Sequence, residues 1–153
     1  MGISCRTSMP SIAAILKKEA NRVDRLTVRA LSKLGEDCVT RIRDRREELN
    51  WDDETGNLRS SIGYIVSKSG EIVTESDFKQ VLSGSEGSTK GRELAEDLAS
   101  KAKDPYNLTI VAGMNYASYV EAKKNKNVLA STELWARAET PGILRKLKEQ
   151  IMK

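Results

Sequence analysis

Apolar residues recur every three or four positions through the first third of the chain. The pattern contains one glycine, Gly35, and no proline, and its members are Ile12, Leu16, Ala20, Val23, Leu26, Ala30, Leu34, Cys38 and Ile42. This spacing predicts an amphipathic helix over residues 11–49, either continuous or broken near Gly35. A continuous helix would be about 55 Å long, more than the diameter of a domain of this size. We therefore expect part of it to project beyond its own core and to contact another surface.

A two-residue period follows and predicts a hairpin over residues 57–75. In residues 57–67, Leu58, Ile62, Tyr64 and Val66 alternate with Arg59, Ser61 and Gly63, as in a half-buried strand. Residues 67–70 read as a turn that ends on a glycine, and residues 71–75 as the returning strand.

The next segment, residues 76–105, reads as a loop and a helix inserted between the second and third strands. Residues 83–91 are mostly Gly and Ser, which predicts a mobile loop. Leu94, Leu98 and Ala102 then form a narrow apolar stripe, which ends at Asp104-Pro105.

One strand and the C-terminal helices complete the pattern. Residues 107–113 alternate like a third strand, and residues 132–152 predict two helices, the second with Thr140 as its N-cap and Pro141 at its first position. We expect a single α+β domain over residues 1–153, in which a mainly antiparallel sheet of three to four strands packs against the long N-terminal helix and a C-terminal helix.

Composition narrows the class of protein. The chain has 153 residues, 5% aromatic residues and a net charge of +4, so its core is aliphatic and its basic excess is mild. Packing against other copies is one way for such a thinly cored domain to bury more surface. Cys5 and Cys38 lack metal-ligand spacing and read as reduced thiols. No apolar run of membrane-spanning length and no signal pattern occur, so we expect the product to stay where it is made.

The sequence contains no catalytic constellation. It has no histidine, which removes the commonest general base and metal ligand, so neither an enzyme nor a metal or cofactor site is expected. Five acidic residues surround Trp51, but their order does not match a calcium loop, and the segment reads as a solvated connection: Glu47, Glu48, Asp52, Asp53 and Glu54. A small hydrolase would have to use Asp52, Asp53 or Glu54. The segment 84–91 precedes a helix and contains Lys90, but it departs from a phosphate-binding loop at Thr89 and Gly91.

The long helix is the most basic part of the chain. Ten basic residues lie between positions 17 and 46: Lys17, Lys18, Arg22, Arg25, Arg29, Lys33, Arg41, Arg43, Arg45 and Arg46. Such a face could bind DNA phosphates, in a salt-dependent way, or be the ordinary polar side of an amphipathic helix. Trp51 and Trp135 could each be an interface anchor or a core residue.

Two short blocks resemble a known family. Thr55-Gly56, Leu58-Arg59 and Ser61-Ile62 open the hairpin, and Tyr116-Ala117 and Tyr119-Val120-Glu121 follow the third strand. Together with the order of elements, they resemble the tail-completion, or head-tail joining, proteins of long-tailed bacteriophages and prophages.

The resemblance implies a structural protein of the virion neck or tail end, present in the host cytoplasm before assembly. It implies a homo-oligomeric ring, a hexamer with a dodecamer as the alternative, that contacts connector and tail proteins and could contact channel DNA nonspecifically, without a membrane partner. The candidate assembly-interface residues are Trp51, Arg59, Tyr64, Tyr116, Tyr119, Glu121 and Trp135. The alternative is a basic DNA-binding accessory protein of a phage or mobile element.

Overall fold

The computed structural model describes residues 9–44, 53–122 and 128–153. Within these ranges the elements, in chain order, are α1 (Met9–Arg43), α2 (Asn57–Ser60), β1 (Ile62–Lys68), β2 (Glu71–Glu75), α3 (Ser85–Lys101), β3 (Asn107–Ala112), α4 (Ala117–Ala122) and α5 (Ala130–Ile151). The fold is α+β, as predicted, and the described residues form three strands. Predicted helical positions 45–49, and Trp51 with them, lie outside the described residues.

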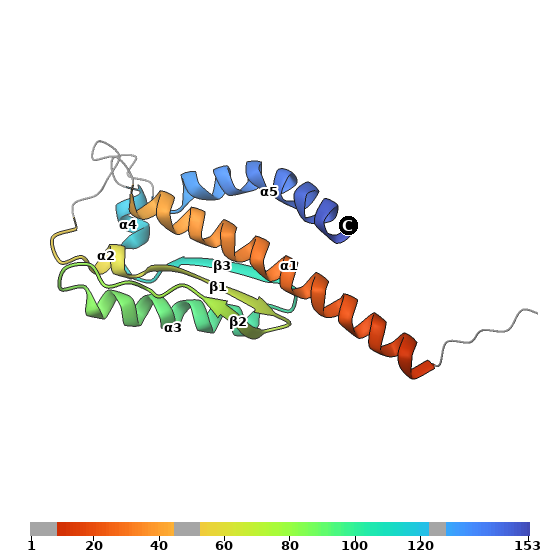
Figure 1. Ribbon diagram of the computed structural model, residues 1–153. Helices are drawn as coiled ribbons and strands as arrows, with labels where there is room; N and C mark the ends of the chain where they lie inside the picture. The colour runs from red at the N-terminus through yellow and green to blue at the C-terminus, as the bar shows by residue number, and fades with distance from the viewer. Residues whose placement is uncertain (1–8, 45–52, 123–127) are drawn as a thin grey trace, which may run out of the picture.

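The elements form layers around an antiparallel sheet of order β2-β1-β3. Helix α1 crosses one face of the sheet, α5 runs antiparallel along α1, and α3 covers the opposite face (Figure 1). The side chains of β1 alternate between two cores. Ile62, Tyr64 and Val66 pack on the α1 side, and Ile65 packs with Ala95 and Ala99 of α3.

Strand β1 is therefore buried on both faces, and the prediction of a half-buried strand was wrong. Six of its seven residues are buried, because a helix covers each side of the sheet. The predicted start of the strand was also wrong. Leu58 and Arg59 lie in the short helix α2, whose backbone N–H groups donate to the carboxylate of Asp53. A side chain that accepts these N–H groups stabilises a helical turn in place of a strand.

Helix α1 is continuous through Gly35, where the absence of a side chain makes room for Tyr64. A Cβ at Gly35 would lie 2.6 Å from the Tyr64 ring. The helix also projects past the sheet, as expected (Figure 1). All residues from Pro10 to Asn21 are exposed except the half-buried Ile12.

The predicted loop at residues 83–91 is instead the first part of α3, which begins at Ser85. The predicted stripe was also misplaced. The buried face of α3 consists of Gly87, Gly91, Ala95 and Ala99, whereas Leu94 and Leu98 are 38% and 44% exposed. Residues without large side chains allow the helix to approach the backbone beneath it.

Of two further predicted boundaries, the structure confirms that of β2 and contradicts the one at Thr140-Pro141. Strand β2 spans the predicted residues 71–75, after a turn in which Ser69 and Gly70 have positive φ. The predicted break at Thr140-Pro141 is absent, since α5 runs through Pro141. Thr140 is not an N-cap, because its hydroxyl donates to the carbonyl of Ala136 one turn earlier in the same helix.

Candidate assembly surface

The first sequence block, residues 55–62, forms a closely packed junction between α2 and α3. Gly56 has a φ of 76° and lies so close to Val81 that a Cβ would stand 2.0 Å from its carbonyl oxygen. The Ser60 hydroxyl donates to the Gly56 carbonyl and accepts from the N–H of Val81. Asn57 accepts a hydrogen bond from the N–H of Gly87 at 3.0 Å. This block therefore holds the fold together locally.

The glycines of α3 complete this junction through backbone contact. A Cβ at Gly87 would lie 2.0 Å from the carbonyl oxygen of Asn57, and one at Gly91 would lie 2.4 Å from that of Ser61. Gly113, after β3, approaches Gly91 so closely that its Cβ would lie 2.5 Å from the Gly91 Cα. The segment considered as a phosphate-binding loop is thus a helix packed on backbone.

The second block, residues 111–121, divides between core and surface. Met114 and Ala117 are buried in the core on the α1 side, whereas Tyr116 and Tyr119 are 37% and 63% exposed. Burial and the nearby negative charges, of which Asp53 ranks first, raise the pKa of Tyr116. The two tyrosines therefore remain available as contact surface.

Glu121, a candidate interface residue, is half-buried and forms hydrogen bonds within the fold. Its carboxylate accepts hydrogen bonds from the backbone N–H groups of Leu129 at 3.0 Å and Ala130 at 2.6 Å. These groups stand at the start of α5, where backbone donors lack partners within the helix. Glu121 thus fixes the beginning of α5 relative to α4.

Tyr64 does not belong to a surface in this structure, so its assignment to an assembly interface was wrong. It is 3% exposed, lies against Gly35 and donates its hydroxyl to Glu36 at 2.9 Å. Burial, followed by the bond to Glu36, raises the pKa of Tyr64 to about 12. Arg59 is half-buried, with its Nε enclosed and unpaired among the described residues.

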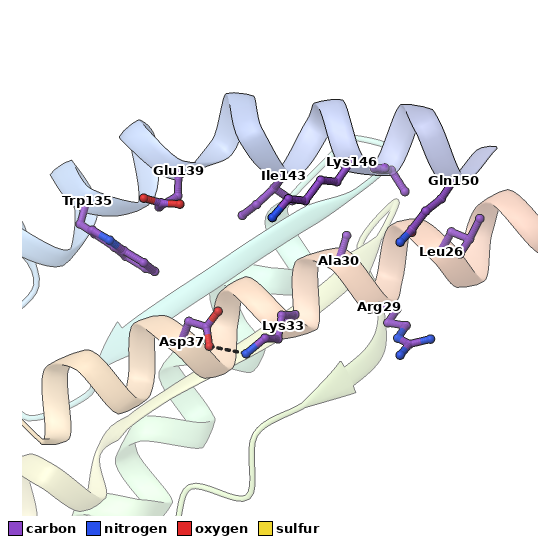
Figure 2. Close-up of a pocket in the computed structure, with 11 residues that line it drawn as sticks. Leu26, Arg29, Ala30, Lys33, Asp37, Trp135, Glu139, Ile143, Lys146 and Gln150 are labelled. Atoms are coloured by element: carbon purple, nitrogen blue, oxygen red, sulfur yellow. Dashed lines mark hydrogen bonds and ion pairs between the residues drawn. The ribbon is translucent and has the colours of Figure 1, made fainter. Parts of the chain in front are cut away.

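Trp135 belongs to a groove between α1 and α5, which we call the α1–α5 groove. The groove has a volume of 390 Å³, and Trp135, Ile143 and Gln150 point into it from α5 (Figure 2). The guanidinium carbon of Arg41 lies 5.0 Å from the Trp135 ring centroid, a cation–π distance. Trp135 therefore contributes to the packing of α5 on α1 as well as to the surface.

Several basic residues of α1 are engaged within the molecule. Arg22 donates to the carbonyls of Gln150 and Ile151 at the end of α5, and Arg43 donates to that of Ile62 at 2.7 Å. Lys33 pairs with Asp37 at 2.7 Å (Figure 2). Arg45 and Arg46 lie outside the described residues. Apart from Arg41, which lies over the Trp135 ring, the exposed basic side chains that these contacts leave are Lys17, Lys18, Arg25 and Arg29.

The projecting part of α1 adds an apolar surface that none of the described helices covers. Ile15 and Leu16 are 58% and 65% exposed, and α5 ends farther along α1, beside Arg22. Sequence reasoning predicted that the helix would project but did not single out these two residues. The sequence does indicate this surface, because the apolar stripe continues into the part of the helix that is too long to pack on the domain's own core.

Asp24 and Cys38 have pKa values that the fold shifts. Asp24 of α1 accepts hydrogen bonds from Lys68 and from Tyr106. These bonds join the helix to the end of β1 and to the residue before β3. The bonds from Lys68 and Tyr106 lower the pKa of Asp24. Burial raises the pKa of the Cys38 thiol to about 11, so it remains protonated near neutral pH.

Within residues 9–44, 53–122 and 128–153, no group of three or more His, Cys, Asp or Glu residues could hold a metal ion. In the same ranges no helix has both the length and the apolar character needed to cross a membrane. No protein-family model matches the chain, and comparisons with curated proteins and with solved structures also find no match.

Proposed function

We propose that this chain is a structural protein of a bacteriophage virion that joins the head or connector to the tail. It acts by surface complementarity as a ring of identical copies and catalyses no reaction. The observation that carries the proposal is the pair of blocks at residues 55–62 and 111–121, which resemble the tail-completion pattern and occur in the same order of elements. Of the candidate interface residues, Tyr116 and Tyr119 are exposed and Trp135 lines the α1–α5 groove, whereas Tyr64 is buried.

The exposed apolar side chains support an assembly role. Ile15, Leu16, Tyr119 and Leu134 are each more than half exposed. Isolated exposed apolar side chains are common on any protein, but neighbouring ones such as Ile15 and Leu16 give the continuous apolar surface that partners bury. The projecting part of α1 has room for such a partner, because α5 does not reach it (Figure 1).

Particle analysis tests this proposal directly. Phage particles from the strain that encodes the chain are purified, and electron cryomicroscopy with mass spectrometry locates and identifies their neck proteins. We expect the chain at the neck or tail end in several copies. Deletion of its coding sequence should leave filled heads and separate tails, and addition of the purified protein should restore joined particles. Normal joining without the chain would contradict the proposal.

The second candidate function is DNA binding by the exposed basic residues of α1. Lys17, Lys18, Arg25 and Arg29 are exposed on this helix and could contact phosphates. A titration of duplex DNA at increasing salt distinguishes the two functions. Micromolar or tighter binding with a steep loss of affinity at higher salt, in a protein absent from particles, would favour DNA binding.

A further inference from the structure

Strand β3 is an open edge of the sheet. It pairs with β1 along Asn107–Ala112, and among the described residues no other strand lies beyond it. Backbone groups on its outer side have no hydrogen-bond partner in the described part of the chain. Helix α5 is held by α1 and does not pair with this edge.

The two edges of the sheet differ in how they resist pairing. Edge strands that stay unpaired commonly carry charges, proline or a bulge. Strand β2 has Glu71 and Glu75 at its ends, and its register with β1 shifts at Val73, which is the signature of a bulge. Strand β3 reads Asn-Leu-Thr-Ile-Val-Ala, with no charge, proline or glycine. Its edge therefore has none of these protections.

The side of β3 that faces α1 and α5 opens onto an apolar groove, which we call the β3-edge groove. This groove has a volume of 450 Å³. Leu108 and Ile110 of β3 form part of its lining, together with Leu31, Leu34 and Leu129. A strand placed beside β3 would direct every second side chain to this side, next to Leu108 and Ile110.

The side that faces α3 is also apolar beside the same edge. Arg92 lies on the β2 side of α3, since it contacts Glu75 and Phe78. Leu94 and Leu98 each come one residue before the buried Ala95 and Ala99, which puts them on the other flank of the helix, toward β3. These leucines are 38% and 44% exposed, so an added strand would cover them with its remaining side chains.

We propose that a second copy of this chain pairs its own β3 with this edge, antiparallel and about a two-fold axis, to form one six-stranded sheet. The occupant is a second copy because β3 complements itself. It has no charge to repel its equivalent, and Leu108 and Ile110 of each copy enter the β3-edge groove of the other. The new ladder continues the existing β1–β3 ladder, and contacts of this kind are isologous. The inference does not rest on the virion role.

Sedimentation velocity at micromolar concentrations tests the pairing, with hydrogen exchange as a second measurement. We expect the wild-type mass to be that of two copies, and the amides of residues 107–112 to become more protected as concentration rises. Thr109→Lys and Leu98→Lys should weaken self-association at least tenfold, because each places like charges at the two-fold contact. Val73→Lys, at a side chain 47% exposed on the opposite edge, is the matched control and should leave the pair intact.

Circular dichroism checks that each variant is folded, and Leu98→Lys is the safer variant because its side chain is already partly in solvent. A wild-type protein that stays monomeric would overturn the inference. So would an assembly that Val73→Lys disrupts as much as Leu98→Lys does, because this result indicates head-to-tail pairing of β2 with β3. Neither result depends on whether the chain is found in particles, so the two proposals can fail separately.

Discussion

Single glycines set the distance between α3 and the rest of the fold. Gly87 meets the carbonyl of Asn57 and Gly91 meets that of Ser61, and in each case the neighbouring atom is backbone. Backbone in a packed junction has little freedom to move away from a new atom. Small side chains on this helix are thus required by its position.

A glycine-to-alanine pair tests this requirement. Gly87→Ala places a Cβ 2.0 Å from the Asn57 oxygen and should lower the free energy of unfolding by about 2 kcal/mol or more, as overpacking does. Gly142→Ala is the control, because nothing lies within 4 Å of its Cβ position in α5. It should leave stability unchanged or raise it by about 0.5–1 kcal/mol, the helix preference of alanine. Urea denaturation measures both, and equal effects would contradict this account.

The contact of Asp24 with Lys68 and Tyr106 makes a pH-dependent contribution to stability. The native pKa of Asp24 is lowered from 3.8, so its stabilisation is present above that ordinary pKa and is lost as pH falls through the native value. Asp24→Asn should therefore be less stable than wild type at neutral pH and should approach wild type in acid. Urea denaturation across this range measures the difference, and a difference independent of pH would exclude the carboxylate as its source.

At the scale of elements, the periodicity of apolar side chains predicted helices and strands well, whereas the Gly and Ser content of a segment did not. The turn that ends on Gly70 located β2, and the alternation of residues 107–113 located β3. The same reasoning predicts a loop at the start of α3, because glycines there favour one, whereas the structure has a helix from Ser85. Their helical signal was the four-residue spacing of Gly87, Gly91, Ala95 and Ala99, which apolar periodicity does not register when the buried residues are so small.

Contacts between distant residues explain the remaining differences. The burial of β1 on both faces depends on α3 lying opposite α1, which no local pattern reveals. Asp53 selects a helical turn at residues 57–60 through its side-chain bonds to the backbone. Among the candidate site residues, the exposed positions of Tyr116 and Tyr119 are compatible with the prediction, whereas Tyr64 fills a space that Gly35 provides within the core.

The connection between α4 and α5 offers a test at this scale. Glu121→Ala removes the acceptor for the N–H groups of Leu129 and Ala130 and should lower stability by about 1 kcal/mol, as the loss of a helix cap does. Glu121→Gln keeps an acceptor oxygen without the charge and should lose less. Thermal unfolding followed by circular dichroism ranks the three proteins. An alanine variant as stable as wild type would show that this cap contributes little.

The whole molecule separates a packed body from a projecting helix. Residues 10–21 are exposed except the half-buried Ile12, and Ile15 and Leu16 belong to neither core cluster. A double change of Ile15→Ser and Leu16→Ser should therefore alter the free energy of unfolding by less than about 0.5 kcal/mol, apart from small helix-propensity costs. In the particle assay the same variant should fail to restore joining. Full joining by the variant would remove this surface from the proposed interface.

Gly113 packs against Gly91 and Gly91 packs against the backbone of Ser61, so no side chain lies at either contact, which limits how the sequence can change. Where two large residues meet, an enlargement of one can be relieved by a reduction of the other. Here no residue smaller than glycine exists, so a side chain gained at either position has no compensating substitution at its neighbour. In a library of random variants, we expect these two positions to accept the fewest replacements, alone or in combination.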